Sequence, residues 1–193
     1  MRLRELGKLG LGLAIGTTLI VLGLAVQELR SRGTEGVSGI TIANYRAEAK
    51  ADDRPAPPFE MPALEGDGTI ALRDFSGKVV VLNFWASWCG PCRLEAPDLQ
   101  RTWEEYRGRG VQFLGINYRD DPAAARAYVG EFGITYPSVF DPAGKLAADY
   151  HLVGLPTTFI VDRNGRISLQ FVGYLDGSVL RAALDDVLGA GSG

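Results

Sequence analysis

The sequence predicts an α/β fold in which a mixed β-sheet is flanked by helices on both faces. Residues 79–85 form a nearly continuous apolar run, which is typical of a central strand covered on both sides. Residues 111–117 repeat this pattern after a helical segment, so strand and helix alternate along the chain. Residues 157–161 and 167–172 flank the turn residues 162–165 (Asp-Arg-Asn-Gly), which predicts a β-hairpin and therefore antiparallel strands in the same sheet.

The first segment of the chain predicts a membrane anchor. Residues 1–8 contain Arg2, Arg4 and Lys8 and are expected to form a cytoplasmic n-region. Residues 9–26 are apolar or small and carry no charge, and as a helix they would span ~27 Å, enough to cross a hydrocarbon core. This run is longer than the apolar region of a signal peptide, about 7–15 residues, and no small-residue cleavage site follows it. We therefore expect a retained transmembrane signal anchor, with a cleaved signal as the alternative.

Residues 27–56 are predicted to be a linker that leads to a folded domain at residues 57–190. The run Arg-Pro-Ala-Pro-Pro at residues 54–58 favours a stiff, extended spacer. From residue 33 onward 15 basic and 21 acidic residues give a net charge of -6, whereas the first 32 residues have a net charge of +3. The acidic domain argues against a nucleic-acid partner, and the basic end fits attachment to a lipid bilayer.

Within the domain, residues 66–68 (Gly-Asp-Gly) predict a hairpin turn. A helix after the second cysteine is predicted by Leu99, Trp103 and Tyr106 at i, i+4 and i+7 spacing. Pro97 lies inside this helix, and its ring is expected to cause a kink.

A second helix is predicted to begin with Asp121 as N-cap and Pro122 at the first helical position, and to run to about Phe132. A short strand at residues 137–140 and a short helix at residues 143–150 follow.

The last helix is expected to start at Ser178. Five residues are predicted to form its buried face: Val179, Leu180, Ala183, Leu184 and Val187.

Cys89 and Cys92 are the two cysteines of the chain, and they stand between the strand at residues 79–85 and the following helix. Two sulfurs at this spacing can close and reopen a disulfide without unfolding the domain, which predicts thiol–disulfide exchange. Two cysteines and the single histidine, His151, do not fill a tetrahedral zinc site, so neither a metal nor a cofactor is predicted. A purely structural disulfide is the alternative, although so short a loop constrains the unfolded chain little.

Cys89 is expected to be the attacking sulfur. It directly precedes a helix, where free N–H groups and the helix dipole favour a thiolate. Cys92 lies within the first turn, so it should be more buried and should attack the mixed disulfide to release the partner. Gly90 and Pro91 fit a turn that enters a helix, because Pro91 needs no donor there.

The segment Phe-Trp-Ala-Ser-Trp-Cys-Gly-Pro-Cys at residues 84–92 resembles the active-site motif of thioredoxin-fold proteins. Residues 154–159 (Gly-Leu-Pro-Thr-Thr-Phe) resemble their cis-proline loop. Residues 93–97 are similar to the membrane-anchored, extracytoplasmic branch of TlpA, ResA and CcmG/DsbE-like thiol–disulfide oxidoreductases. The resemblance covers about residues 57–188 and implies a thioredoxin-like sheet, and the stretch between residues 118 and 155 matches the insert of that branch.

The resemblance also implies a substrate site. Pro156 is expected to be cis and to lie against the disulfide as part of the catalytic site, and the backbone of Leu155 should pair with a bound chain by strand addition. The residues expected to contact substrate are Trp88, Gly90, Pro91, Leu155 and Thr157.

Glu95 follows Cys92 by three positions and shares its helix face. If burial raises its pKa, its carboxylate can take the proton of Cys92 during resolution, and the match to an acid of ResA-like proteins supports this catalytic role. A solvent-facing glutamate is the alternative. Asn83 stands where thioredoxin has a buried acid. Because an amide cannot shuttle a proton, proton transfer is expected to depend on Glu95 instead. The alternative is that Asn83 is simply a hydrogen-bonded core residue.

We therefore expect a membrane-tethered protein-disulfide oxidoreductase that faces the extracytoplasmic side and acts as a reductant. The resemblance implies protein disulfide substrates, apocytochrome c among them, and a membrane thiol transporter as electron donor. A thiol peroxidase is a second hypothesis, because residues 57–82 resemble the opening of peroxiredoxin-like domains, although no Pro-x-x-x-Thr-x-x-Cys motif precedes Cys89. A third is a tethered binding module in which the cysteines are incidental.

Overall fold

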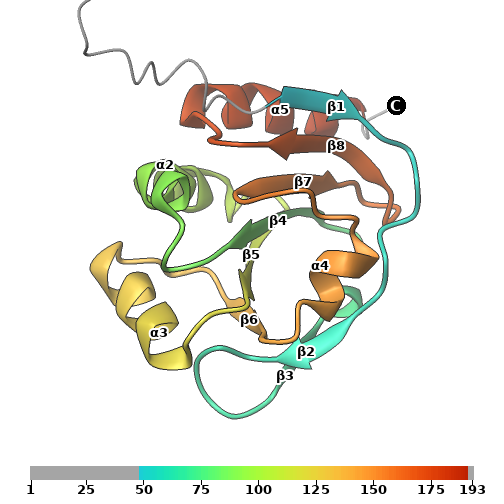
Figure 1. Ribbon diagram of the computed structural model, residues 1–193. Coiled ribbons are helices and arrows are strands. Elements are labelled where there is room, and N and C mark those ends of the chain that lie inside the picture. The colour runs from blue at the N-terminus through green and yellow to red at the C-terminus, as the bar shows by residue number, and fades with distance from the viewer. Residues whose placement is uncertain (1–47, 191–193) are drawn as a thin grey trace, which may run out of the picture. The chain divides into compact units, whose positions relative to one another are not determined.

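The computed structural model describes residues 48–190, and the predicted n-region and anchor of residues 1–26 lie outside the described residues. No helix within residues 48–190 has the length and apolar character needed to cross a membrane. The described chain forms a six-stranded sheet in the order β1-β8-β7-β4-β5-β6 and a two-stranded sheet of β2 and β3 (Figure 1). The strands are β1 (Glu48–Ala51), β2 (Glu60–Pro62), β3 (Thr69–Ala71), β4 (Val79–Trp85), β5 (Val111–Tyr118), β6 (Ser138–Asp141), β7 (Thr157–Val161) and β8 (Ile167–Val172).

Strand β4 is the centre of the larger sheet. All seven of its residues are buried, as the apolar run predicted. It pairs in parallel with β5 and antiparallel with β7, so the predicted mixed sheet is confirmed. Alternate side chains of β4 enter different cores: Val81 and Trp85 join one, and Leu82 and Phe84 join the other.

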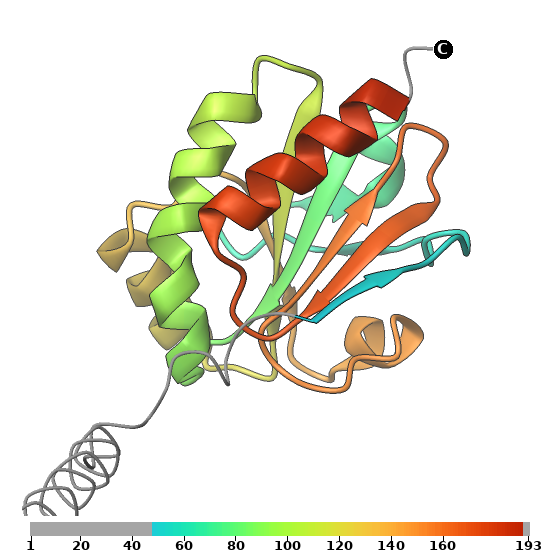
Figure 2. The same cartoon turned by 90° about the horizontal axis from the view of Figure 1, so that it is seen from above.

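Helices cover both faces of this sheet. One core is closed by α2 (Gly90–Tyr106), α3 (Pro122–Glu131) and α5 (Gly177–Ala190), and the other by α4 (Lys145–Asp149) and the β2–β3 hairpin with its 3-10 turn (Leu72–Phe75). Figure 2 shows α2 and α5 side by side on one side of the sheet, with α4 on the other. The predicted placement of helices on both faces is confirmed.

Local signals in the sequence are matched by the structure. The Asp121 carboxylate accepts hydrogen bonds from the N–H groups of Ala123 and Ala124, both at 2.9 Å, and so caps α3 as predicted.

The prediction that Val179 is buried is wrong, since 43% of that residue is exposed. The buried face of α5 is centred on Leu180, and a neighbour one position away lies about 100° around a helix from it.

The sheet extends into the segment predicted to be a linker. Strand β1 pairs antiparallel with β8, and Pro55 forms an isolated bridge with Arg166. The N–H of Ala56 donates to the carbonyl of Gly165 at 2.9 Å. Residues 48–56 therefore lie along the domain and are hydrogen-bonded to it.

Candidate active site

The disulfide lies where β4 ends and α2 begins. Cys89 and Cys92 are bonded to each other, as their spacing predicted. Cys89 is the N-cap of α2, and its sulfur accepts a hydrogen bond from the N–H of Cys92 at 3.2 Å. Cys89 is 5% exposed and Cys92 is fully buried, so Cys92 is the more buried of the two, as predicted. In the reduced protein the same N–H and the helix N-terminus are placed to stabilise a thiolate at Cys89.

A groove of about 400 Å³ opens beside Cys89. The peptide bond between Leu155 and Pro156 is cis, as the resemblance implied, and Leu155 lines this groove. Four of the five residues predicted to contact substrate line it: Trp88, Gly90, Pro91 and Leu155. The structure places Thr157 elsewhere, because its side chain is fully buried and its hydroxyl donates to the carbonyl of Gly154 at 2.8 Å. Thr157 therefore shapes the proline loop from within.

Four other lining residues were not predicted to contact substrate: Tyr118, Leu152, Val153 and Gly154. Tyr118 ends β5, and the carboxyl ends of the parallel strands β4 and β5 meet at one edge of the sheet, so strand order contains a signal for it. Val153 is 78% exposed and Trp88 is 61% exposed, which gives the groove an apolar rim.

The turn before Cys89 is held by Asp120. Its carboxylate accepts hydrogen bonds from the N–H of Ser87 at 2.6 Å, the hydroxyl of Ser87 at 2.8 Å and the amide of Asn117 at 2.8 Å. Burial alone would raise the pKa of Asp120, but these hydrogen bonds outweigh it and lower that pKa. The indole N–H of Trp88 donates to the carbonyl of Arg119 at 3.2 Å, which orients the exposed ring at the groove.

Glu95 is fully buried, so the solvent-facing alternative is excluded. Its Oε1 accepts a hydrogen bond from the side-chain amide of Asn83 at 2.7 Å, and its Oε2 accepts one from the N–H of Leu175 at 3.0 Å. Asn83 also donates to the hydroxyl of Thr158 at 3.0 Å, so it is a hydrogen-bonded core amide.

The environment of Glu95 favours its neutral form. Burial raises its pKa from 4.5 to about 8, and the nearby carboxylate of Asp98 adds to that rise. The hydrogen bonds from Leu175 and Asn83 act in the opposite direction without offsetting the burial. With the disulfide closed, Glu95 therefore holds its proton at neutral pH.

Aromatic residues brace the start of α2 from α3. The hydroxyl of Tyr128 donates to the carbonyl of Cys92 at 2.8 Å. The Tyr128 ring stacks on Trp85 with centroids 4.3 Å apart, and Trp85 shares a core with both cysteines. Trp85 thus belongs to the core that also holds the disulfide, and the contact of Tyr128 with Cys92 was not predicted.

Comparison with known proteins gives a consistent result. Residues 53–170 match the AhpC/TSA family. The chain is 39% identical over 132 residues to the thiol:disulfide interchange protein DsbE of Pseudomonas fluorescens biotype C, covering 68% of this chain and 72% of that protein. It is 32% identical over 141 residues to the thiol-disulfide oxidoreductase ResA of Bacillus thuringiensis subsp. konkukian (strain 97-27), covering 72% and 81%.

A solved structure agrees with these relatives. A thiol:disulfide interchange protein of the thioredoxin family from Chlorobium tepidum TLS matches with a TM-score of 0.65 at 28% identity, covering 72% of this chain and 99% of that one. The predicted thioredoxin-like fold is confirmed.

The buried acid makes stability depend on pH. Between pH 4.5 and about 8 the unfolded chain has lost the proton of Glu95 while the folded protein keeps it, so raising the pH favours unfolding. The slope contributed by one such group is at most about 1.4 kcal/mol per pH unit. We expect the Glu95→Gln variant of the oxidised protein to lack this loss, so that its stability relative to the wild type rises from pH 5 to 8 and then levels off. Urea unfolding of both proteins across this range measures the difference, and parallel curves would contradict the assignment.

Proposed function

This chain belongs to the AhpC/TSA family and is one of its thiol–disulfide oxidoreductases, and from that premise we propose that it reduces disulfides of extracytoplasmic proteins from a membrane tether. The observation that carries the proposal is the position of the disulfide. Cys89 lines a groove beside the cis-proline loop, while Cys92 lies behind it with no exposed surface.

The burial of Cys92 supports the following order of thiol steps. The Cys89 thiolate attacks one sulfur of a substrate disulfide, whose S–S bond breaks, and the other substrate sulfur leaves as a thiolate and takes up a proton. Cys92 then attacks the sulfur of Cys89, so the mixed disulfide breaks and the second substrate thiolate is released. Two electrons pass from the cysteine pair to the substrate, and a thiol donor must later return them. Because Cys92 is fully buried, the donor also enters through Cys89.

Glu95 is proposed to carry the proton of Cys92 in both directions. When a donor thiolate opens the Cys89–Cys92 disulfide, Cys92 leaves as a thiolate, and the protonated Glu95 one helical turn away can supply a proton. When Cys92 resolves the mixed disulfide, the resulting carboxylate takes that proton back. A pKa of about 8 suits both roles near neutral pH.

The groove is proposed to take an extended segment of the substrate protein. Its rim is apolar at Trp88 and Val153, which fits a chain that is not fully folded. Gly90 and Pro91 line the groove next to Cys89, and the backbone of Leu155 would pair with the segment as an added strand.

Residues 9–26 are proposed to anchor the protein, with the domain on the extracytoplasmic side. The uncharged run is long enough to span a bilayer, and basic residues precede it. A membrane thiol protein would then be the electron donor. Apocytochrome c, which carries reducible cysteines, is the substrate that the resemblance to CcmG/DsbE-like proteins suggests.

The order of attack is tested by trapping. In the Cys92→Ser variant the resolving sulfur is absent, so we expect a stable mixed disulfide between Cys89 and its substrate, recovered from cells by non-reducing electrophoresis and identified by mass spectrometry. The Cys89→Ser variant is the matched control and should trap little, because Cys92 is buried. Adducts at Cys92 alone would reverse the assignment. Rapid turnover of peroxide by the wild type would favour a peroxidase instead.

The role of Glu95 is tested by single-turnover kinetics with a model peptide disulfide. We expect Glu95→Gln to leave the attack by Cys89 nearly unchanged but to slow the release of peptide about a hundredfold at neutral pH, because the proton acceptor is gone. Release in the wild type should depend on pH with a midpoint set by Glu95, and this dependence should be missing in the variant. Equal release rates in the two proteins would remove Glu95 from the mechanism.

The topology is tested by labelling in intact cells. After mild reduction, a membrane-impermeant maleimide should modify Cys89 of the wild type without lysis and should not modify the Cys89→Ser variant. The protein should remain in the membrane fraction after an alkaline wash. Labelling that requires lysis would place the domain on the other side.

A further inference from the structure

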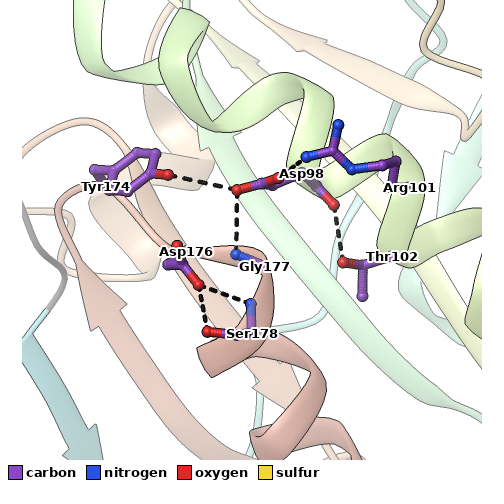
Figure 3. A network of polar contacts seen from close by, with 7 residues as sticks. All are labelled: Asp98, Arg101, Thr102, Tyr174, Asp176, Gly177 and Ser178. Carbon is purple, nitrogen blue, oxygen red and sulfur yellow. Dashed lines mark hydrogen bonds and ion pairs between the residues drawn. The ribbon is translucent and has the colours of Figure 1, made fainter.

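Asp98 lies on α2 three positions after Glu95 and faces the turn that joins β8 to α5 (Figure 3). Its Oδ2 accepts hydrogen bonds from the N–H of Gly177 at 3.3 Å and from the hydroxyl of Tyr174 at 3.4 Å. Its Oδ1 forms an ion pair with Arg101 on the outer surface of the helix. The side chain is 20% exposed, so one end of the carboxylate faces solvent and the other holds the turn.

The turn held by Asp98 is the one that supplies a donor to Glu95. Leu175 lies between the two residues that Asp98 contacts, Tyr174 and Gly177, and its N–H donates to Glu95 at 3.0 Å. Leu175 is 1% exposed, so this bond forms inside the core. Helix α2 therefore contacts this turn through two side chains, Glu95 inside the core and Asp98 at the edge of the core.

The contact between α2 and this turn is close. A Cβ atom added at Gly177 would lie 3.2 Å from the Cβ and 3.3 Å from the Cγ of Asp98, tighter than ordinary van der Waals contact. The next residues begin α5, where the carboxylate of Asp176 accepts a hydrogen bond from the N–H of Ser178 at 2.8 Å. The absence of a side chain at Gly177 lets the backbone reach the carboxylate of Asp98.

We propose that Asp98 is a positioning residue for Glu95, because it holds the turn at residues 174–177 so that the N–H of Leu175 points at the Glu95 carboxyl group. The proposal rests on the proposed function of Glu95 as the proton carrier for Cys92. In this arrangement the proton affinity of Glu95 depends on a side chain at the edge of the site that touches neither sulfur.

Other titratable groups also face Glu95. Tyr128 on α3, Tyr136 before β6 and Tyr174 after β8 interact with it, and burial raises the pKa of each, so all three stay neutral through the working range. Asp98 acts on Glu95 in two ways, since its charge raises the pKa while the amide that it positions lowers it. A test must therefore separate the charge of Asp98 from its hold on the turn.

Two variants of the full-length protein separate the charge of Asp98 from its hydrogen bonds to the turn. Asp98→Asn removes the charge but keeps an oxygen that can accept from Gly177, whereas Asp98→Ala removes both. Glu105→Ala, which deletes an exposed carboxylate of the same helix, is the matched control. The readout is the amide signal of Leu175 in ¹H–¹⁵N spectra across pH 5–10, followed together with the carboxyl carbon of Glu95.

In the wild type and in Glu105→Ala we expect the Leu175 amide to shift with the same midpoint as the Glu95 carboxyl. In Asp98→Asn that shift should persist. In Asp98→Ala it should disappear, hydrogen exchange at Leu175 should become about tenfold faster, and peptide release should be about tenfold slower than in Asp98→Asn. Hydrogen exchange at the amides of β4 serves as the control for the core, because a variant that is destabilised as a whole would show faster exchange there too.

A Leu175 amide that follows Glu95 equally in Asp98→Ala and Asp98→Asn, with equal release rates, would overturn the proposal. This outcome is distinct from failure of the proposed function, which shows as unimpaired peptide release in Glu95→Gln. If peptide release is slow in Glu95→Gln but equal in Asp98→Ala and Asp98→Asn, Glu95 is the proton carrier and Asp98 does not position it.

Discussion

The buried carboxyl group of Glu95 is the interaction on which the arrangement of the active site depends. Through Asn83 it joins α2 to the central strand β4, and through Leu175 it joins α2 to the turn before α5. An ionised carboxylate in such a place is costly even when its oxygens accept hydrogen bonds, because two neutral donors do not replace water. The fold therefore holds Glu95 as an acid. Both oxygens of Glu95 accept hydrogen bonds from N–H groups, and a glutamine has a single acceptor oxygen, so an amide would not make both contacts in this arrangement.

The topology of the sheet explains why the other parts of the site meet at one edge. Strand β4 runs toward the disulfide, and its antiparallel partner β7 starts at the same edge, with Phe84 opposite Thr157. The cis Pro156 immediately precedes β7, so this pairing brings it to the end of β4. The parallel strand β5 ends at that edge too and brings Asp120, which fixes the turn at Ser87. Backbone pairing in the core thus brings the loops to one edge, where side chains such as Asp120 fix them.

Features that depend on neighbouring residues could be predicted from the sequence. Local patterns predict the buried strand at residues 79–85, the disulfide at a helix start and the hairpin. The cis bond at Pro156 required a resemblance to a known family, since most bonds before proline are trans. Burial of Glu95 was expected only as the condition under which its carboxylate could accept the proton of Cys92. Its donor could not be predicted, because Leu175 lies 80 positions away and contributes a backbone group that no side-chain pattern marks. The contact from Tyr128 was missed for the same reason, since α3 reaches α2 only through tertiary packing.

The geometry supports the proposed order of the thiol steps but says nothing of their net direction. Cys92 has no exposed surface, so a partner would be expected to meet Cys89 first. An acid with a pKa near the working pH can protonate Cys92 as the disulfide opens and accept the proton as it closes, so the role proposed for Glu95 would assist both directions. Direction then follows from the reduction potentials of the partners that reach the groove. The proposed reductase would need a stronger reductant to supply its electrons, and the proposed tether would keep the domain close to such a donor.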